Sequence, residues 1–368
     1  MKKLFSVISF ALLLTSTLVL AFGIQPVEAG VTIYILPDGS VDPPTAPIQR
    51  VGDTYSLYDN IYDSVVVGRD NIIIDGAGYA LEGTGAIGSV GMDLSHRENV
   101  TVRSMQIKSF YIGIRIFGSN NNVSGNALSN NNNGIYLYSL SSPPNSGHNS
   151  ISGNNITANT APGIHLERAS NNSINDNTIA RSVYGIYLRE SSNNSISGNK
   201  MTLNDFHGIF LQYSSNYNSI SGNDITANKA FGILLHTSSN NNSIVGNNVT
   251  NNLQYGIYLD SSSKNTLYHN NFIYNNQQVY SSSSTNTWDN GFPSGGNFWG
   301  DYEDRYPNAT EIDASGLWNT PYYIDSNNQD NYPIIPEFPS ATILPLVMAL
   351  SAIAVVFARK KRLKKTET

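Results

Sequence analysis

The chain has 368 residues, contains no cysteine and carries a formal net charge of −6 at pH 7. Without cysteine, disulfides, thiolate metal sites and c-type haem attachment are excluded. The acidic balance argues against nucleic acid as a partner, because nucleic acids are bound by basic surfaces. Only 13% of the residues are charged, below the roughly 25% of an average globular protein, so most polar side chains are uncharged.

Residues 1–29 have the pattern of a secretory signal peptide. Lys2 and Lys3 precede an apolar run from Leu4 to Phe22, and a small-residue cleavage site ends at Ala29. We therefore expect an exported protein, with an uncleaved membrane anchor as the alternative. Residues 30–90 hold a strand, a Pro-rich turn and irregular apolar segments. We expect them to form an N-terminal cap and the first irregular coils, since a stack of strands needs its edge protected.

Residues 91–276 repeat one pattern eight times. Each copy opens with Gly-(Ile/Met)-x-Leu or a close variant, and successive opening glycines lie 22, 21, 29, 22, 23, 24 and 24 residues apart. Asn-x-Ile-x-x-Asn-x-Ile-x-x-Asn then follows in most copies. The three apolar segments are too short for helices and alternate with a period near two. The repeat predicts an all-β fold, a right-handed parallel β-helix solenoid with three short strands per coil.

Two columns of asparagine accompany the repeat. Stacked coils lie roughly 4.8 Å apart, so a side-chain amide on one coil can donate to the next coil and accept from the previous one. We predict two buried asparagine ladders, and we expect these asparagines to take the left-handed conformation that the turns require. The first ladder contains Asn126, Asn154, Asn177, Asn199, Asn223, Asn247 and Asn270, and the second contains Asn131, Asn159, Asn204, Asn228, Asn252 and Asn275.

The C-terminal part breaks the repeat. Residues 277–335 are rich in glycine and aromatic residues, and we expect them to form a C-terminal cap. Residues 336–340 read Pro-Glu-Phe-Pro-Ser and form a linker or sorting motif. Residues 341–358 lack charge and are just long enough for one transmembrane helix. Residues 359–368 are strongly basic, so the positive-inside rule places them in the cytoplasm and the repeats outside.

The C-terminal arrangement of motif, apolar span and basic tail resembles archaeal PEF-CTERM sorting signals. That resemblance implies an archaeal, cell-surface protein whose anchor is cleaved and replaced by a lipid through an archaeosortase. A plain single-span membrane anchor is the alternative.

Two aromatic segments carry a second resemblance. They are Gly296-Asn297-Phe298-Trp299-Gly300-Asp301-Tyr302 and Pro321-Tyr322-Tyr323-Ile324-Asp325. Together with the repeats, over roughly residues 31–335, they resemble NosD-type right-handed β-helix proteins, a branch of the carbohydrate-binding and sugar-hydrolase (CASH) domains. The resemblance implies copper maturation, a surface role or carbohydrate activity. Many relatives carry an Asp-rich loop suited to calcium, but residues 312–319 contain one acid, so no calcium site is predicted.

The opening strand of each repeat presents a candidate binding face. Its Ile and Leu point inward, so the intervening residues face outward and form an aromatic stripe flanked by polar groups. Sugar rings stack on such side chains, and exposed aromatic stripes tend to mark interaction sites. Simple cover of a sheet by strand-favouring residues is the alternative. The candidate carbohydrate-binding residues are Tyr136, Tyr138, His165, Glu167, Tyr187, Arg189, Phe210, Gln212, His236, Tyr258 and Asp260.

No catalytic residue, metal site or cofactor is predicted. Glycosidases need two carboxylates across the scissile bond, whereas here opposite charges stack on adjacent coils. The predicted pairs are Asp93 with Arg115, Glu167 with Arg189, Arg168 with Glu190, Lys200 with Asp224 and Asp205 with Lys229. Of the six histidines, only His165, His207 and His236 lie near the same strand, and they fall in different columns of successive coils, which disfavours copper. A polysaccharide or surface glycan is thus the expected partner, with a CASH-type lyase or hydrolase and a NosD-like copper-binding protein as alternatives.

Sequons recur along the chain. An exported protein can carry N-linked glycans at Asn-x-Ser/Thr, although a repeat rich in these residues also produces the motif by chance. The candidate glycosylation sites are Asn99, Asn171, Asn193, Asn241 and Asn308.

Overall fold

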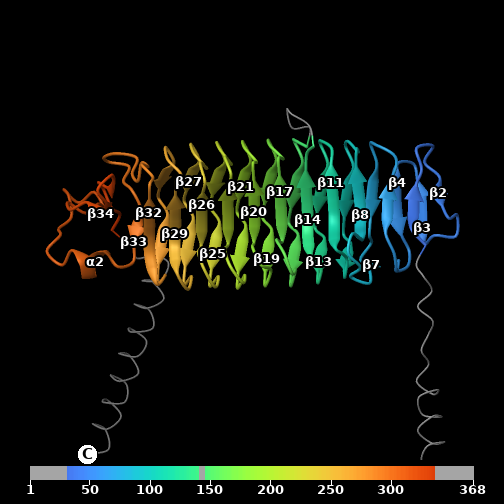
Figure 1. Ribbon diagram of the computed structural model, residues 1–368, viewed down its shortest axis with the longest axis horizontal. Coiled ribbons are helices and arrows are strands. Elements are labelled where there is room, and N and C mark those ends of the chain that lie inside the picture. The colour runs from blue at the N-terminus through green and yellow to red at the C-terminus, as the bar shows by residue number, and fades with distance from the viewer. Residues whose placement is uncertain (1–30, 141–145, 336–368) are drawn as a thin grey trace, which may run out of the picture.

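The computed structural model describes residues 31–140 and 146–335, and in this region the chain winds into a long right-handed parallel β-helix (Figure 1). Three sheets run along the rod, and each coil of the repeat region adds one short strand to every sheet. The prediction of three short parallel strands per coil is therefore confirmed.

The strands of the three sheets are as follows. The twelve-stranded sheet contains β1 (Ile33–Ile35), β2 (Val41–Asp42), β5 (Val65–Val67), β8 (Val90–Ser95), β11 (Ile112–Phe117), β14 (Asn133–Tyr138), β17 (Ile164–Glu167), β20 (Ile186–Arg189), β23 (Ile209–Gln212), β26 (Ile233–His236), β29 (Tyr255–Asp260) and β32 (Gln277–Ser282). The eleven-stranded sheet contains β3 (Ile48–Val51), β4 (Thr54–Leu57), β6 (Ile73–Asp75), β9 (Thr101–Arg103), β12 (Asn122–Ser124), β15 (Ser150–Ser152), β18 (Ser173–Asn175), β21 (Ser195–Ser197), β24 (Ser219–Ser221), β27 (Ser243–Val245) and β30 (Thr266–Tyr268). The ten-stranded sheet contains β7 (Ala80–Glu82), β10 (Gln106–Lys108), β13 (Ala127–Ser129), β16 (Asn155–Thr157), β19 (Thr178–Ala180), β22 (Lys200–Thr202), β25 (Asp224–Thr226), β28 (Asn248–Thr250), β31 (Asn271–Ile273) and β33 (Phe298–Trp299).

The opening motif of each repeat sets the register of the twelve-stranded sheet. Its Ile and Leu side chains are fully buried, as Ile186 and Leu188 illustrate. A Cβ added at Gly185 would lie 2.6 Å from Met201 Cγ and would also overlap the carbonyl oxygen of Gly208 on the next coil. Glycine therefore recurs at this position because adjacent coils approach too closely for a side chain.

The predicted asparagine ladders are confirmed. The side-chain amide of Asn154, which is buried, donates to Asn177 Oδ1 at 2.9 Å, and its own Oδ1 accepts from Asn126 Nδ2 at 3.1 Å. The second ladder departs from this pattern at its start, where Asn131 donates to Asn159 Oδ1 through its backbone N–H at 3.1 Å and Asn159 donates to the hydroxyl of Ser182 at 3.3 Å. Each bond joins adjacent coils, so the ladders hold the stack together along its axis.

A third ladder, which the sequence analysis did not single out, lies at the entry to the eleven-stranded sheet. Each member donates to the next through its side-chain amide, at distances such as 2.9 Å from Asn149 to Asn172. It consists of Asn121, Asn149, Asn172, Asn194, Asn218, Asn242, Asn265 and Asn286.

The prediction that the ladder asparagines take the left-handed conformation is wrong. The left-handed residue of each turn is the one before the ladder position, for example Gly153 (φ 62°) before Asn154 and Asp176 (φ 56°) before Asn177. The left-handed residue reverses the chain at the surface, and the next side chain then points into the turn, where its ladder partners lie.

The C-terminal cap closes the rod (Figure 1). It contains α2 (Tyr302–Arg305), β34 (Tyr322–Asp325) and β35 (Asn328–Asp330). Trp299 stacks between Phe272 of the last coils, at 4.9 Å, and Tyr322 of the cap, at 4.3 Å. Asn270 donates to Asn297 at 2.9 Å, and Asn328 accepts from the backbone of Asn286 at 2.9 Å. The cap therefore continues two ladders and satisfies their last amides.

The membrane segments expected from the sequence lie outside the described residues. These are the signal peptide at 1–29, the linker at 336–340, the transmembrane helix at 341–358 and the basic tail at 359–368. Between residues 31 and 140 and between 146 and 335, no helix is long and apolar enough to cross a membrane.

Candidate functional site

The register of the twelve-stranded sheet arranges the outward residues of the predicted stripe in two columns. In the first, Tyr136 lies opposite His165, His165 opposite Tyr187 and Tyr187 opposite Phe210, and Leu234 and Tyr258 follow. In the second, Tyr138, Glu167, Arg189, Gln212, His236 and Asp260 lie opposite one another in turn. These twelve residues are called the outward face below.

The rings of the outward face stack on one another along the rod. Ring centres lie 4.8 Å apart from Tyr136 to His165, 4.7 Å from His165 to Tyr187 and 4.9 Å from Tyr187 to Phe210. A ring with a neighbour on each side has both faces covered, so it presents its edge to solvent. Along the middle of the outward face, sugars would meet ring edges and hydroxyl groups rather than open ring faces.

A second row of rings, missed by the sequence analysis, widens the stripe. It comprises Tyr184, His207, Phe231 and Tyr255, each of which immediately precedes an opening glycine, and that position is the signal that could have found it. This row also bridges the gap that Leu234 leaves in the first column. Phe210 contacts His207 edge-to-face with ring centres 5.4 Å apart, and His207, Phe231 and Tyr258 then stack at centre distances of 4.7 and 4.9 Å.

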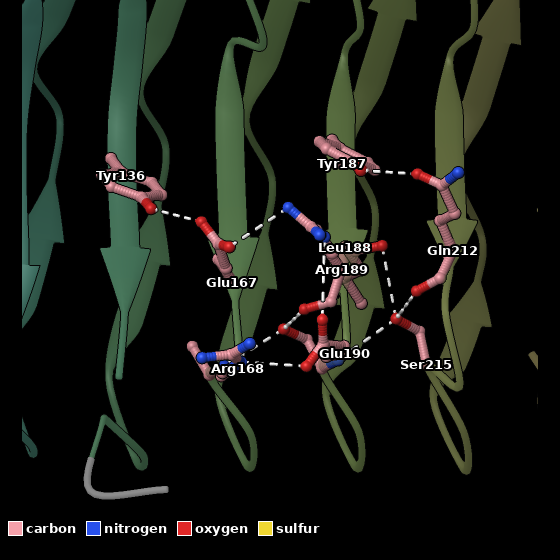
Figure 2. A network of polar contacts seen from close by, with 11 residues as sticks. Tyr136, Glu167, Arg168, Tyr187, Leu188, Arg189, Glu190, Gln212 and Ser215 are labelled. Atoms are coloured by element: carbon pink, nitrogen blue, oxygen red, sulfur yellow. Dashed lines mark hydrogen bonds and ion pairs between the residues drawn. The ribbon is translucent and has the colours of Figure 1, made fainter. Parts of the chain in front are cut away.

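Polar side chains of the second column form a network across the coils (Figure 2). The hydroxyl of Tyr136 donates to Glu167 Oε2 at 2.5 Å, and Arg189 Nη1 lies 3.4 Å from Glu167 Oε1. Two coils along, the hydroxyl of Tyr187 donates to Gln212 Oε1 at 2.7 Å. Contacts between coils thus hold each of these polar groups in a defined position beside the ring stack.

Burial controls the protonation of the stacked rings. It lowers the pKa of His165 and of His207 to about 4, so both imidazoles are neutral at neutral pH. Burial raises the pKa of Tyr187 to about 12, and burial together with the hydrogen bond to Glu167 raises the pKa of Tyr136. The hydroxyls of Tyr136 and Tyr187 therefore stay protonated and serve as hydrogen-bond donors.

Four of the five predicted ion pairs are confirmed. Asp93 pairs with Arg115, Glu167 with Arg189, Glu190 with Arg168 at 2.9 Å and Asp205 with Lys229 at 2.6 Å. The predicted pair of Lys200 and Asp224 is different: the two lie opposite in register, but Asp224 accepts a hydrogen bond from Asn248 at 3.1 Å instead. His236 Nδ1 lies 2.9 Å from Asp260 and adds a contact at the far end of the face.

Within residues 31–140 and 146–335, no group of three or more His, Asp or Glu side chains could hold a metal ion. The methionines of this region, Met92, Met105 and Met201, are buried in the hydrophobic core. Their thioethers are therefore committed to packing.

The candidate glycosylation sites lie mostly in exposed turns. Asn99, Asn171 and Asn193 are exposed and left-handed, each at the turn before a strand of the eleven-stranded sheet. Asn241 occupies the same turn but is half-buried, and Asn308 is exposed in the cap. Glycosylation at these positions stays a prediction.

Fold and face together define a right-handed parallel β-helix protein with an outward sheet face of rings and polar groups. A family profile described as periplasmic copper-binding protein (NosD) matches residues 60–214 and 141–304, which together exceed half of the chain. The chain belongs to the NosD family, as the resemblance of its repeats and aromatic segments predicts. Among curated proteins, none matches the sequence.

Several solved structures share the fold at low identity. The periplasmic alginate epimerase AlgG is 18% identical, with a TM-score of 0.44 over 64% of this chain and 68% of that chain. DFA-IIIase from Arthrobacter chlorophenolicus A6, without its lid, is 16% identical, with a TM-score of 0.41 over 65% and 64%. Tailspike protein 2 of bacteriophage CBA120 is 13% identical, with a TM-score of 0.47 over 62% and 39%. This chain spans less than two thirds of the last two, and likeness at this level concerns the fold alone.

Proposed function

We propose that this protein is exported and binds a polysaccharide along its outward face. The observation that carries the proposal is the second outward column, which places one polar side chain on every coil from Tyr138 to Asp260, beside a row of rings that contact one another. A linear polymer presents hydroxyl groups at regular intervals, so a regular row of donors and acceptors suits it.

The periplasmic description of the NosD family supports export. We further propose that residues 341–358 anchor the chain in the membrane.

Binding would use hydrogen bonds to the polar column more than stacking on ring faces. Gln212 accepts from Tyr187 through Oε1, which leaves its amide hydrogens for a ligand. Arg189 has five N–H groups and uses only some of them in its contacts with Glu167 and Glu190, so the others can donate to a ligand. Because these side chains are already held by neighbouring coils, little conformational freedom is lost on binding.

A glycan array probed with the full-length chain tests the proposal. The variants Gln212→Ala and His236→Ala each remove one polar group from the face. Each should weaken binding about 2- to 10-fold, the value of one hydrogen bond. Gln49→Ala, an exposed glutamine on the eleven-stranded sheet, is the matched control and should leave affinity unchanged. Equal weakening by the control, or no binding to any glycan, would contradict the proposal.

Product analysis on the same samples tests the alternative of a lyase or hydrolase. Glu167 and Glu190 are the acids nearest the centre of the face, and both are paired with arginine. We therefore expect bound glycans to be recovered at their original length. Release of shorter products would favour an enzyme, and copper binding at micromolar affinity or tighter would favour the metal-binding alternative.

A further inference from the structure

A pocket lies where the stacked coils meet the C-terminal cap. Its volume is about 450 Å³, and it is lined by Gln277 and Tyr280 of β32 and by Asp301, Arg305 and Tyr323 of the cap. β32 is the terminal strand of the twelve-stranded sheet, and β34 packs beside it (Figure 1). The pocket is therefore at the C-terminal end of the outward face.

The ring stack ends at this pocket. Tyr280 stacks on Tyr258 with ring centres 4.8 Å apart, which covers one face of Tyr280. In the described part of the chain, no further ring stacks on the opposite face, and Tyr280 is 40% exposed. Unlike Tyr187 in the middle of the stack, Tyr280 has a stacked ring on one face and lines the pocket beside the cap, so its other face is open to a ligand.

Two charged side chains, Asp301 and Arg305, line the pocket with Tyr280 and have donors or acceptors that are free to bind a ligand. The carboxylate of Asp301 accepts from the hydroxyl of Tyr322 at 3.0 Å, yet its side chain is 36% exposed. Arg305 donates to the carbonyl of Tyr323 at 2.9 Å, and its guanidinium lies 4.2 Å from the centre of the Tyr322 ring. These contacts fix both side chains without consuming all their donors and acceptors, so the polar part of the pocket is preorganised.

We propose that this pocket binds one neutral pyranose residue, with the apolar face of the sugar on Tyr280 and its hydroxyls bonded to Asp301 and Arg305. The two charges lie 3.9 Å apart and offset each other, which favours a neutral sugar over an acidic one. Because the cap ends the sheet, a glycan that follows the outward face places its terminal residue here. That placement rests on the proposed function, whereas binding of a single pyranose does not.

Calorimetric titration of the full-length chain tests the pocket. The probes are methyl glycosides of glucose, galactose and mannose, together with a hexasaccharide of each sugar. Tyr280→Ala removes the open ring and should weaken binding roughly 10-fold. Asp301→Asn keeps an oxygen for the Tyr322 hydroxyl but removes one acceptor, and should weaken binding about 3- to 10-fold. Tyr274→Ala, at a 79% exposed tyrosine outside the pocket, is the control and should have no effect.

The outcomes separate the pocket from the outward face. The proposal that the pocket binds a pyranose is overturned if both pocket variants bind the probes as tightly as the wild type does. It is also overturned if Tyr274→Ala weakens binding equally, or if the wild type binds no probe. If Gln212→Ala weakens hexasaccharide binding and neither pocket variant does, the proposed function stands without the pocket. If the pocket variants weaken binding of single glycosides and the hexasaccharides bind no more tightly, the pocket stands and the proposed function fails. Circular dichroism confirms that each variant is folded.

Discussion

Replacing one rung of an asparagine ladder should destabilise the rod far more than replacing the asparagine next to it. Asn154 is buried in the first ladder, whereas Asn155 is exposed at the start of β16. The variants Asn154→Ala and Asn155→Ala therefore make the same chemical change at adjacent positions. Any difference between them reports the ladder rather than the loss of an asparagine as such.

The hydrogen bonds of Asn154 determine the expected magnitude. Its Oδ1 accepts from the backbone and the side chain of Asn126 at 3.0 and 3.1 Å, and its Nδ2 donates to the carbonyl of Val123 at 2.9 Å. Alanine removes these three bonds and the donation to Asn177 Oδ1 at 2.9 Å. The Asn126 backbone N–H then has no partner, whereas the Asn126 side-chain amide keeps its bond to the carbonyl of Val102 at 3.0 Å. A buried unsatisfied group costs about 1–3 kcal/mol, and some relaxation is expected, so the free energy of unfolding should fall by about 3–6 kcal/mol. Asn155→Ala should change it by less than about 0.5 kcal/mol.

Urea unfolding followed by far-ultraviolet circular dichroism measures both variants, because that signal reports all coils at once. Hydrogen exchange should show added opening in the coils next to Asn154, since each coil of a solenoid contacts only its neighbours. Equal unfolding midpoints for the two variants would refute the reasoning. In that case the ladder amides would be no better satisfied in the rod than in water.

Other predictions concern the cap, the stack and the glycine column. Burial raises the pKa of Asp330 to about 7, so between pH 4 and 7 the folded state binds one more proton than the unfolded state. The free energy of unfolding should therefore fall as pH rises through that window. Asp330→Asn should remove this fall from a plot of urea unfolding midpoint against pH. Burial lowers the pKa of His165 to about 4, so between pH 6.5 and 4 the unfolded state binds a proton that the folded state does not. The free energy of unfolding should therefore fall as pH drops through that window, and His165→Phe should remove this fall in the same assay. Gly185→Ala should lower the thermal midpoint well beyond Gly222→Ala, because a Cβ meets Gly208 and Met201 at the first site and open space at the second.

Much of the fold could be predicted because the repeat aligns distant residues. Once the glycines mark one coil each, buried Ile and Leu set the strand register, and a one-residue slip would expose the whole core. Ladder positions such as Asn177 follow from that register. The cap could not be aligned in this way, because Asn297 and Asn328 continue the ladders from outside the repeat spacing. Their partners are set by how the cap folds over the last coil.

The candidate site was predictable in position but not in ring orientation. The alternating pattern places Tyr136, His165 and Tyr187 on the outward face, but it does not specify the side-chain torsions that turn each ring onto the next. That orientation decides the chemistry, because stacked rings cover one another. Sequence reasoning therefore placed these residues on the outward face correctly but overestimated the open ring surface.

Repetition also explains where a distinctive binding environment can arise in such a rod. Inside the stack, each ring has a neighbour above and below, so every coil resembles the next and offers mainly edges and hydrogen-bonding groups. An open ring face requires a coil with no successor, which occurs only at an end of the stack. At one end, Tyr280 lines the pocket beside the cap. At the other end, His96 packs on Phe117 and, together with Glu98, lines a pocket of about 390 Å³. Under the proposed function, we therefore expect selectivity for one sugar over another to reside at the ends of the stack, and the repeated coils between them to add affinity for a chain.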